Sequence, residues 1–293
     1  MFIISYGPIK HAINSKLGAS NFKPLDEQLN DTYNLIEAVD ATGGTTTTGG
    51  ANAKLNNILQ KMDDFTDLFI MSYFFPSIDL GSIPIGSIVL DYGSNFEGHQ
   101  LSWRIAAKNH PGYPLDSVTL ITTHCIGRTQ FSSSLEGVNN QYPGSILANY
   151  FSLDFPRDFI SNKMRNNLLG TQIPIFRLNN TSGTMSARVF APSRTEMNLG
   201  AEGSVTEGFP FPIFTDNTSR IVNALGNAEG WYLLRTPVQG NTINVRYVGA
   251  SDGIMWPVNM TTPLAFRPVC NLPASMEIVE DPTTPGRYLI SSL

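Results

Sequence analysis

Charged residues are scarce in this 293-residue sequence, where Asp, Glu, Lys and Arg together make up only 15% of the chain. Soluble domains usually contain about 25%. The formal net charge is −5 and no run of Lys or Arg occurs, so the chain lacks the basic surface that neutralises nucleic-acid phosphates. We therefore expect no nucleic-acid partner. The neutral surface, rich in Asn, Ser, Thr and Gly, suits an extracellular or assembled protein better than a cytosolic enzyme.

Long apolar runs are also absent. No window approaches the about 18 apolar residues that cross a bilayer, so we expect no membrane insertion. The apolar stretch at residues 1–6 is too short for the hydrophobic part of a signal peptide, and no basic segment precedes it. We expect a protein that acts outside the cell to leave by another route, such as a particle released by lysis.

The chain contains only two cysteines, Cys125 and Cys270. Two cysteines are too few for a disulfide framework. A single long-range disulfide remains an alternative, but cysteine is commonly a small buried core residue. We favour two buried free thiols.

Motifs that carry chemistry are missing as well. The spacing of His99, His110 and His124 matches no zinc or metalloprotease pattern, and the chain has no nucleophile elbow, phosphate loop or dinucleotide fingerprint. We therefore predict no metal, no cofactor and no enzymatic activity. A glycan hydrolase stays open as a second alternative, because it needs only two facing carboxylates. Its candidate acids are Asp154, Asp158, Glu196, Glu202 and Glu207.

Residues 1–80 differ in pattern from the rest. Apolar residues recur at helical spacing in 24–40 and in 55–69, and a Gly/Thr tract at 43–50 separates these two stretches. Two helices of this length cannot bury both apolar stripes unaided. We expect residues 1–80 to be a helical segment for attachment or oligomerisation, which packs on the following domain, on copies of itself or on a larger assembly.

Beyond a Pro- and Gly-punctuated hinge at 76–86, the pattern becomes one of short strands and long loops. It predicts a helix at 155–169, which ends at Gly170. It predicts strands at 87–90, 101–106, 117–123, 188–190, 229–235, 243–248 and 287–290. Short strands combined with helices predict an α+β fold for residues 81–293.

Aromatic residues supply the candidate ligand contacts. An exposed aromatic ring beside Asn or Asp can stack on a sugar while the polar group bonds its hydroxyls. Because large aromatics are mostly buried, we predict that Trp231 lies in a core strand, and core burial is also the simpler interpretation of Tyr247. Trp256, in the loop 251–257, is the best candidate for an exposed contact. We expect the contacts in the loop segments 200–217 and 249–262. The predicted ligand-binding set is Trp256, Tyr247, Asp252 and Asn259.

Two blocks, at 230–237 and 266–273, each place an Arg beside bulky apolar residues and just before a Pro. A planar, multi-donor guanidinium in this setting can hydrogen-bond loop carbonyls or a carboxylate. We predict that Arg235 and Arg267 serve as such clips. Neither block contains a nucleophile–base pair.

In order and spacing, these blocks resemble an uncharacterised domain family of bacterial surface proteins and tailed-phage virion proteins. The family pattern includes a Trp-bearing strand, a W-(W/Y)-L-R-(S/T)-P block and a G-V-R-P-A-x-x-L block, similar to those of C-type-lectin-like folds. The chain departs from it at 265–266, where Ala-Phe replaces Gly-Val. The resemblance implies a C-type-lectin-like display domain with small sheets and long loops, and no catalytic residues. Its structural residues here are Trp103, Trp231, Arg235, Pro237, Arg267 and Pro268.

The resemblance further implies a phage virion structural protein, located on the particle at the capsid, tail fibre or baseplate. We expect residues 1–80 to bind other virion proteins in a homo-oligomer, and residues 81–293 to bind a host cell-surface glycan. One alternative is a capsid or tail decoration protein that stabilises the particle and has no host ligand.

Overall fold

The structure is a computed structural model that describes residues 77–133, 139–177, 180–226, 228–281 and 284–290. All of these residues belong to one compact unit, Asp64–Leu293. The helices predicted at 24–40 and 55–69, and most of the predicted attachment segment 1–80, lie outside the described residues. Among the residues that are described, no helix is long and apolar enough to span a bilayer.

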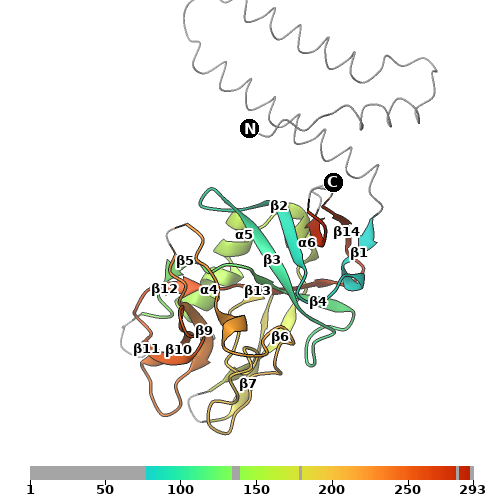
Figure 1. The fold of residues 1–293 in the computed structure, drawn as a ribbon. Helices are drawn as coiled ribbons and strands as arrows, with labels where there is room; N and C mark the ends of the chain where they lie inside the picture. The colour runs from blue at the N-terminus through green and yellow to red at the C-terminus, as the bar shows by residue number, and fades with distance from the viewer. Residues whose placement is uncertain (1–76, 134–138, 178–179, 227, 282–283, 291–293) are drawn as a thin grey trace, which may run out of the picture. The chain divides into compact units, whose positions relative to one another are not determined.

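The larger of two main sheets has eight strands and mixed pairing (Figure 1). The β2–β3 hairpin turns at Glu97 and Gly98, which both have positive φ; such turns match the twist of antiparallel strands. β1 pairs with β14, so the chain joins this sheet directly after residue 77. In spatial order the strands are β1 (Ile78–Asp79), β14 (Glu277–Glu280), β15 (Arg287–Ile290), β2 (Ile88–Phe96), β3 (His99–Lys108), β4 (Ser117–Thr122), β13 (Val269–Pro273) and β8 (Val189–Phe190).

The second main sheet has five strands, drawn mostly in orange at the lower left of Figure 1. A separate hairpin pairs β6 (Thr171–Phe176) with β7 (Ser182–Ala187). Two 3-10 helices, η1 (Leu80–Ser82) and η2 (Thr218–Arg220), lie in the connections. In spatial order the strands of the five-stranded sheet are β11 (Met255–Asn259), β10 (Asn244–Val248), β9 (Tyr232–Pro237), β12 (Leu264–Phe266) and β5 (Ile126–Thr129).

The chain passes between the two sheets at two neighbouring places. Residues 123–125 lead from β4 in the large sheet to β5 in the small one, and Arg267 with Pro268 leads from β12 back to β13. The Thr122 amide donates to the Pro268 carbonyl at 3.1 Å, and the Arg267 Nε donates to the Thr122 carbonyl at 2.8 Å. The second Arg block therefore joins the two sheets.

Three short α-helices are present in the described part of the chain: α4 (Ile146–Ser152), α5 (Asp154–Phe159) and α6 (Asn162–Asn167). Ser145 caps α4 by accepting from the Ala148 amide at 3.0 Å, as an N-terminal serine commonly does. The single helix predicted at 155–169 is therefore wrong in part. It breaks at Ile160, which is extended, and Ser161 then caps α6.

Aromatic side chains from the helices and both sheets form the core. The Phe266 ring, at the end of β12, lies with its centroid 5.4 Å from Tyr150 and 5.5 Å from Phe151, both on α4. It also lies 6.0 Å from Phe96 on β2. A Cβ on Gly127 would approach the Phe266 and Phe96 rings to 2.7 Å, so glycine lets β5 pack this closely.

The predicted α+β class is wrong for the described residues. The described residues form a mainly-β fold. Its strands run from β1 to β15, and each of its α-helices has only six or seven residues. The predicted strands were found as β2, β3, β4, β8, β9, β10 and β15. Eight strands were not predicted and shift the class: β1, β5, β6, β7 and β11 to β14.

Candidate functional site

Three aromatic side chains gather at the edge of the five-stranded sheet, and we refer to Trp231, Tyr247 and Trp256 as the aromatic cluster. Tyr247 on β10 pairs directly with Trp256 on β11, and the Trp231 and Tyr247 ring centroids are 6.0 Å apart. Directly paired residues of antiparallel strands present their side chains on the same face. Trp231 is 44% exposed and Trp256 47% exposed. The rings therefore offer neighbouring apolar surfaces to solvent.

A fixed carboxylate borders the aromatic cluster. The Trp256 indole donates to Asp252 Oδ2 at 3.2 Å, and the Ile254 amide donates to Asp252 Oδ1 at 2.9 Å. Asp252 is half-buried, and each of its oxygens keeps a second lone pair for a ligand hydroxyl. The site thus combines aromatic faces with an oriented acceptor.

The turn that supports Trp256 is held in place by close packing and hydrogen bonds. Gly253 has a φ of +63°, and a Cβ there would lie 1.9 Å from the Asn217 carbonyl oxygen. The Arg220 Nε donates to the Gly253 carbonyl at 3.0 Å, and the Gly249 amide donates to the Ile254 carbonyl at 2.8 Å. These contacts fix the turn against η2, so the Trp256 ring is presented by an ordered backbone.

The structure gathers most of the predicted ligand-binding residues, with two differences. Trp256, Tyr247 and Asp252 lie together, and Trp256 is exposed as predicted. The prediction that Trp231 is a core residue was wrong. Trp231 stands just before β9, and it is the following residue, Tyr232, that points into the core. Asn259 lies at the far end of β11, where its Oδ1 accepts from the Thr261 amide at 3.0 Å.

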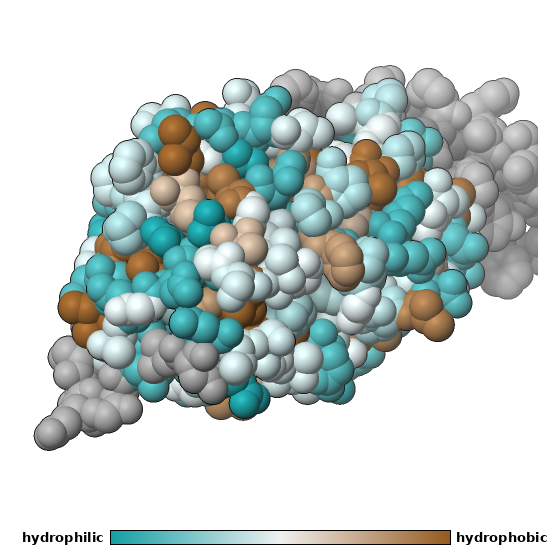
Figure 2. Space-filling model, turned by 90° about the horizontal axis from the view of Figure 1, so that it is seen from below, coloured by the Kyte–Doolittle hydropathy of each residue, from teal (hydrophilic) through white to brown (hydrophobic). Residues whose placement is uncertain are grey.

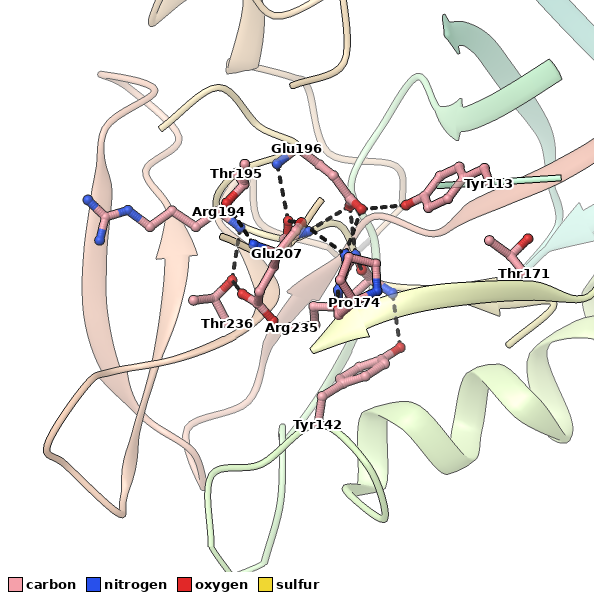
Figure 3. Close-up of polar contacts among 12 residues, drawn as sticks. Tyr113, Tyr142, Thr171, Pro174, Arg194, Thr195, Glu196, Glu207, Arg235 and Thr236 are labelled. Carbon is pink, nitrogen blue, oxygen red and sulfur yellow. Dashed lines mark hydrogen bonds and ion pairs between the residues drawn. The ribbon is translucent and has the colours of Figure 1, made fainter. Parts of the chain in front are cut away.

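A fully buried ion pair lies at the centre of the domain (Figure 3). Arg235 Nη1 and Nη2 each donate to the Glu196 carboxylate at 2.6 Å, and both side chains are completely buried. The guanidinium also donates to the carbonyls of Pro174 at 3.1 Å and Ala191 at 2.9 Å. The predicted role of Arg235 as a clip is therefore confirmed. It joins β6, the segment after β8 and β9.

Two further groups complete the coordination of Glu196. The Tyr113 hydroxyl donates to Oε1, and the Ser193 amide donates to Oε2 at 3.0 Å. Burial lowers the pKa of Arg235, but the charge and hydrogen bonds of Glu196, together with Tyr113 and Glu207, outweigh burial and hold the pKa above its ordinary value. Burial raises the pKa of Tyr113, and the Glu196 charge raises it further. Glu196 is therefore hydrogen-bonded by Arg235, Tyr113 and the Ser193 amide.

A second buried acid, Glu207, lies beside this pair (Figure 3). It accepts from the Thr236 hydroxyl and from the Phe176 amide, the latter at 2.9 Å. Burial raises the pKa of Glu207, which Arg235 and the Thr236 hydroxyl oppose only in part. Glu196 and Glu207 thus anchor the segment 191–211 to β6 and β9.

Glu202 fastens the same segment to β10. It accepts from Arg246 Nη2 at 2.7 Å and from Arg194 Nη1 at 2.6 Å. Burial alone would raise the pKa of Glu202, but the hydrogen bonds from Arg246, Gln239 and Arg194 lower it below its ordinary value. Within 200–217, predicted as a contact loop, Glu202 and Glu207 therefore act as internal supports.

The other predicted structural residues have varied surroundings. Trp103 is fully buried on β3, Pro237 ends β9, and Pro268 accepts from the Thr122 amide as described above. Arg267 is a confirmed clip through its bond to the Thr122 carbonyl. Cys125 and Cys270 are buried and free, which confirms the favoured alternative of two free thiols.

A groove of about 670 Å³ is lined by residues from α4 to β7, including Arg157, Arg165 and Arg188, but no carboxylate or histidine lines it. No group of three or more His, Cys, Asp or Glu side chains within the described ranges could hold a metal ion. On the face seen in Figure 2, apolar residues form separate brown patches among polar ones.

The fold and the site together define a mainly-β domain with buried arginine clips and a surface aromatic cluster. The chain belongs to the family described as the domain of unknown function DUF6273, whose model matches residues 116–274. That range runs from the start of β4 to the end of β13 and includes both Arg blocks and the aromatic cluster. Neither the search of curated proteins nor the search of solved structures found a match.

The sequence did not indicate Glu196, Tyr113 or Glu202 as framework residues. Glu196 and Glu202 were two among several equivalent acids, and Glu196 is 39 positions from Arg235. The only available signal is chemical: a chain with so few charges that buries an Arg needs an acid to pair with it.

Proposed function

We propose that this protein is a non-catalytic, particle-bound binding protein that recognises host cell-surface glycans through the aromatic cluster. The observation that carries the proposal is the joint exposure of Trp231 and Trp256 beside the fixed Asp252 carboxylate. Aromatic faces bind the apolar face of a sugar ring, and a carboxylate accepts from its hydroxyls.

The rigidity of the surroundings supports a role in recognition. Asp252 and the Gly253 turn are hydrogen-bonded in place before any ligand arrives, which lowers the entropy that binding would cost. Each site offers a small contact area, so individual sites would bind weakly. Many copies on one particle would raise the overall affinity through multivalency. A virion location, assembly through residues 1–80 and a homo-oligomeric state belong to the same proposal.

The buried position of the acids argues against the hydrolase alternative. A glycosidase needs two carboxylates that face a sugar about 5–9.5 Å apart. Glu196 and Glu207 have 0% and 1% of their surface exposed, and both are hydrogen-bonded within the domain. Asp154 and Asp158 are exposed and paired with Arg157.

A binding assay on the full chain tests the proposal. We would measure binding to a glycan array and to intact bacterial cells for the wild type and for Trp231→Ala and Trp256→Ala. Each substitution should weaken binding by about tenfold, as for an aromatic at the centre of a contact. The control is Leu115→Ala, which removes a side chain that is 88% exposed outside the cluster and should leave binding unchanged.

Two outcomes would contradict the proposal. One is that the wild type binds neither glycans nor cells, while the Trp variants lose association with particle subunits; the protein would then be a decoration protein. The other is binding that all three variants retain, which would place the contact elsewhere.

A further inference from the structure

Arg267 is fully buried, yet most of its hydrogen-bonding capacity is unused. Its Nε donates to the Thr122 carbonyl at 2.8 Å, whereas Nη1 and Nη2 have no hydrogen-bond partner among the described residues. Its exposed surface is 0%. A buried charge without a countercharge is costly, so these two nitrogens call for an acceptor.

Aromatic rings hold this guanidinium but do not satisfy it. The Arg267 Cζ lies over the rings of Phe214 and Tyr232, 5.5 Å from each centroid. Cation–π contacts offset part of the desolvation cost. The Tyr232 hydroxyl donates its proton to the Arg220 carbonyl at 3.0 Å. Burial raises the pKa of Tyr232 and Arg267 opposes the rise, so this hydroxyl lies near the guanidinium without supplying a countercharge.

Two more basic groups are close enough to Arg267, near the junction of the sheets, for its charge to lower their pKa. Arg104 comes from β3, and its Nε is also buried without a partner. His124 lies in the link from β4 to β5. Burial lowers the pKa of both groups, and the Arg267 charge lowers both further. No carboxylate is among the charges that shift either pKa, so the three groups form a basic cluster without a countercharge in the described chain.

The other Arg block provides an internal comparison. Arg235 is equally buried and also stacks on an aromatic ring, with its Cζ 5.6 Å from the Phe190 centroid. Its two Nη atoms are both satisfied by Glu196. Arg267 has the same burial and the same aromatic support, but the described chain supplies no acid in the place of Glu196.

We propose that Arg267, together with Arg104 and His124, binds an oxyanion from outside the described chain at the junction of the two sheets. A planar fork of N–H donors matches the two oxygens of a carboxylate, phosphate or sulfate. Arg104 and His124 are half-buried, whereas Arg267 is fully buried, so an anion would approach Arg267 from the side of Arg104 and His124. Tyr232 faces this site while its neighbour Trp231 belongs to the aromatic cluster, so the two sites are separate.

Titration of the full chain with sodium phosphate, sodium sulfate and sodium glucuronate, against chloride at equal ionic strength, tests the proposal. Calorimetry and the thermal midpoint are the readouts. We expect at least one oxyanion to bind and raise the midpoint. Arg104→Gln should weaken that binding by about tenfold, in line with one charge-assisted hydrogen bond. If glucuronate is the only oxyanion that binds, the ligand is an acidic sugar. If phosphate or sulfate binds as well, the site accepts oxyanions in general.

Arg128→Gln is the matched control, because it removes the same charge from an exposed residue of β5 that pairs with Glu229. It should leave oxyanion binding within about twofold of the wild type. If the Arg267→Lys variant folds, it should bind the oxyanion more weakly than the wild type. If it does not fold, the Arg104→Gln variant alone tests the proposal. The proposal is overturned if no oxyanion binds, or if the Arg104 and Arg128 variants lose affinity equally. Trp256→Ala should not affect this binding, which separates the outcome from that of the glycan proposal.

Discussion

Arg235 and Glu196 form a two-hydrogen-bond ion pair, with both donor–acceptor distances at 2.6 Å and both side chains completely buried. The pair connects the strand that leads into the aromatic cluster with the segment 191–211 and with β6. A buried pair is a weak source of net stability, but removing one partner leaves an uncompensated charge. The arrangement therefore makes the position of β9 depend on two residues far apart in sequence.

Glu196→Gln should lower the free energy of unfolding by about 3–5 kcal/mol, because it leaves the Arg235 charge buried and unpaired. Urea denaturation of the full chain measures the change. Glu229→Gln removes a carboxylate from an ion pair in which both partners are 46% exposed and should cost less than about 1 kcal/mol. If both variants lower the free energy of unfolding equally, the buried pair matters no more for stability than the exposed pair.

The stability of the domain should fall as the pH drops below about 6.5. Burial lowers the pKa of His110, a decrease that Glu196 and the Phe209 backbone only partly offset. The unfolded chain therefore binds a proton at a higher pH than the folded chain. The contribution of His110 is complete above the unfolded pKa of about 6.5 and is lost as pH falls from there through the lower folded pKa.

The variant His110→Phe tests this origin, because Phe keeps a ring against Tyr113 and Phe211, whose centroids lie 4.7 and 4.9 Å from His110. The free energy of unfolding, measured by urea denaturation from pH 7.5 to pH 5, should depend less on pH in this variant than in the wild type. His124 also has a lowered pKa, so part of the dependence should remain. An unchanged slope would exclude His110 as a source.

Gly253→Ala should displace the turn that presents Trp256, because the new Cβ would meet the Asn217 carbonyl oxygen at 1.9 Å. The control is Gly240→Ala, where φ is +69° but no atom lies within 4 Å of the new Cβ. Both variants share the strain of a positive φ. Gly253→Ala should cost about 1–3 kcal/mol more, the usual range for overpacking, as measured by urea denaturation. Equal costs would mean that the turn yields freely and does not hold Trp256.

Both thiols should resist modification in the folded protein. Burial raises the pKa of Cys125 to about 12, with Arg267 opposing the rise, and burial also raises the pKa of Cys270. Because the thiolate is the reactive form, Ellman's reagent at pH 8 should release no colour from the native chain and two equivalents after denaturation. A fast native reaction would contradict the burial, and no reaction after denaturation would indicate a disulfide.

The sequence predicted those parts of the fold whose local pattern agrees with their surroundings. In β3, β4 and β10, apolar residues either alternate with polar ones or follow one another directly. Strand β15 was predicted with its observed bounds. β6 and β7 were missed because β6 contains Pro174 and β7 is rich in Ser, Gly and Thr, which are poor strand signals. Pairing between the two strands of the hairpin, which no local pattern records, determines their conformation. The strands that the sequence pattern missed, β6 and β7 among them, account for the wrong fold class.

The candidate site was predictable in its residue types but not in its partners. Arg235 and Arg267 stood out because a guanidinium among apolar residues needs acceptors, and both were found as clips. Glu196 could not be singled out, since nothing local distinguishes it from other acids. Trp231 was assigned to the core because large aromatics are usually buried, whereas here it stands just before β9, whose six residues are all buried.

The most direct test of glycan recognition uses the tryptophan indoles as reporters. The chain contains only three, Trp103, Trp231 and Trp256, so ¹⁵N-labelled full chain should show three indole N–H signals. We would titrate it with a glycan selected on the array. The account predicts that the Trp231 and Trp256 signals move while that of the buried Trp103 stays in place. Binding that leaves the signals of Trp231 and Trp256 unmoved would contradict it.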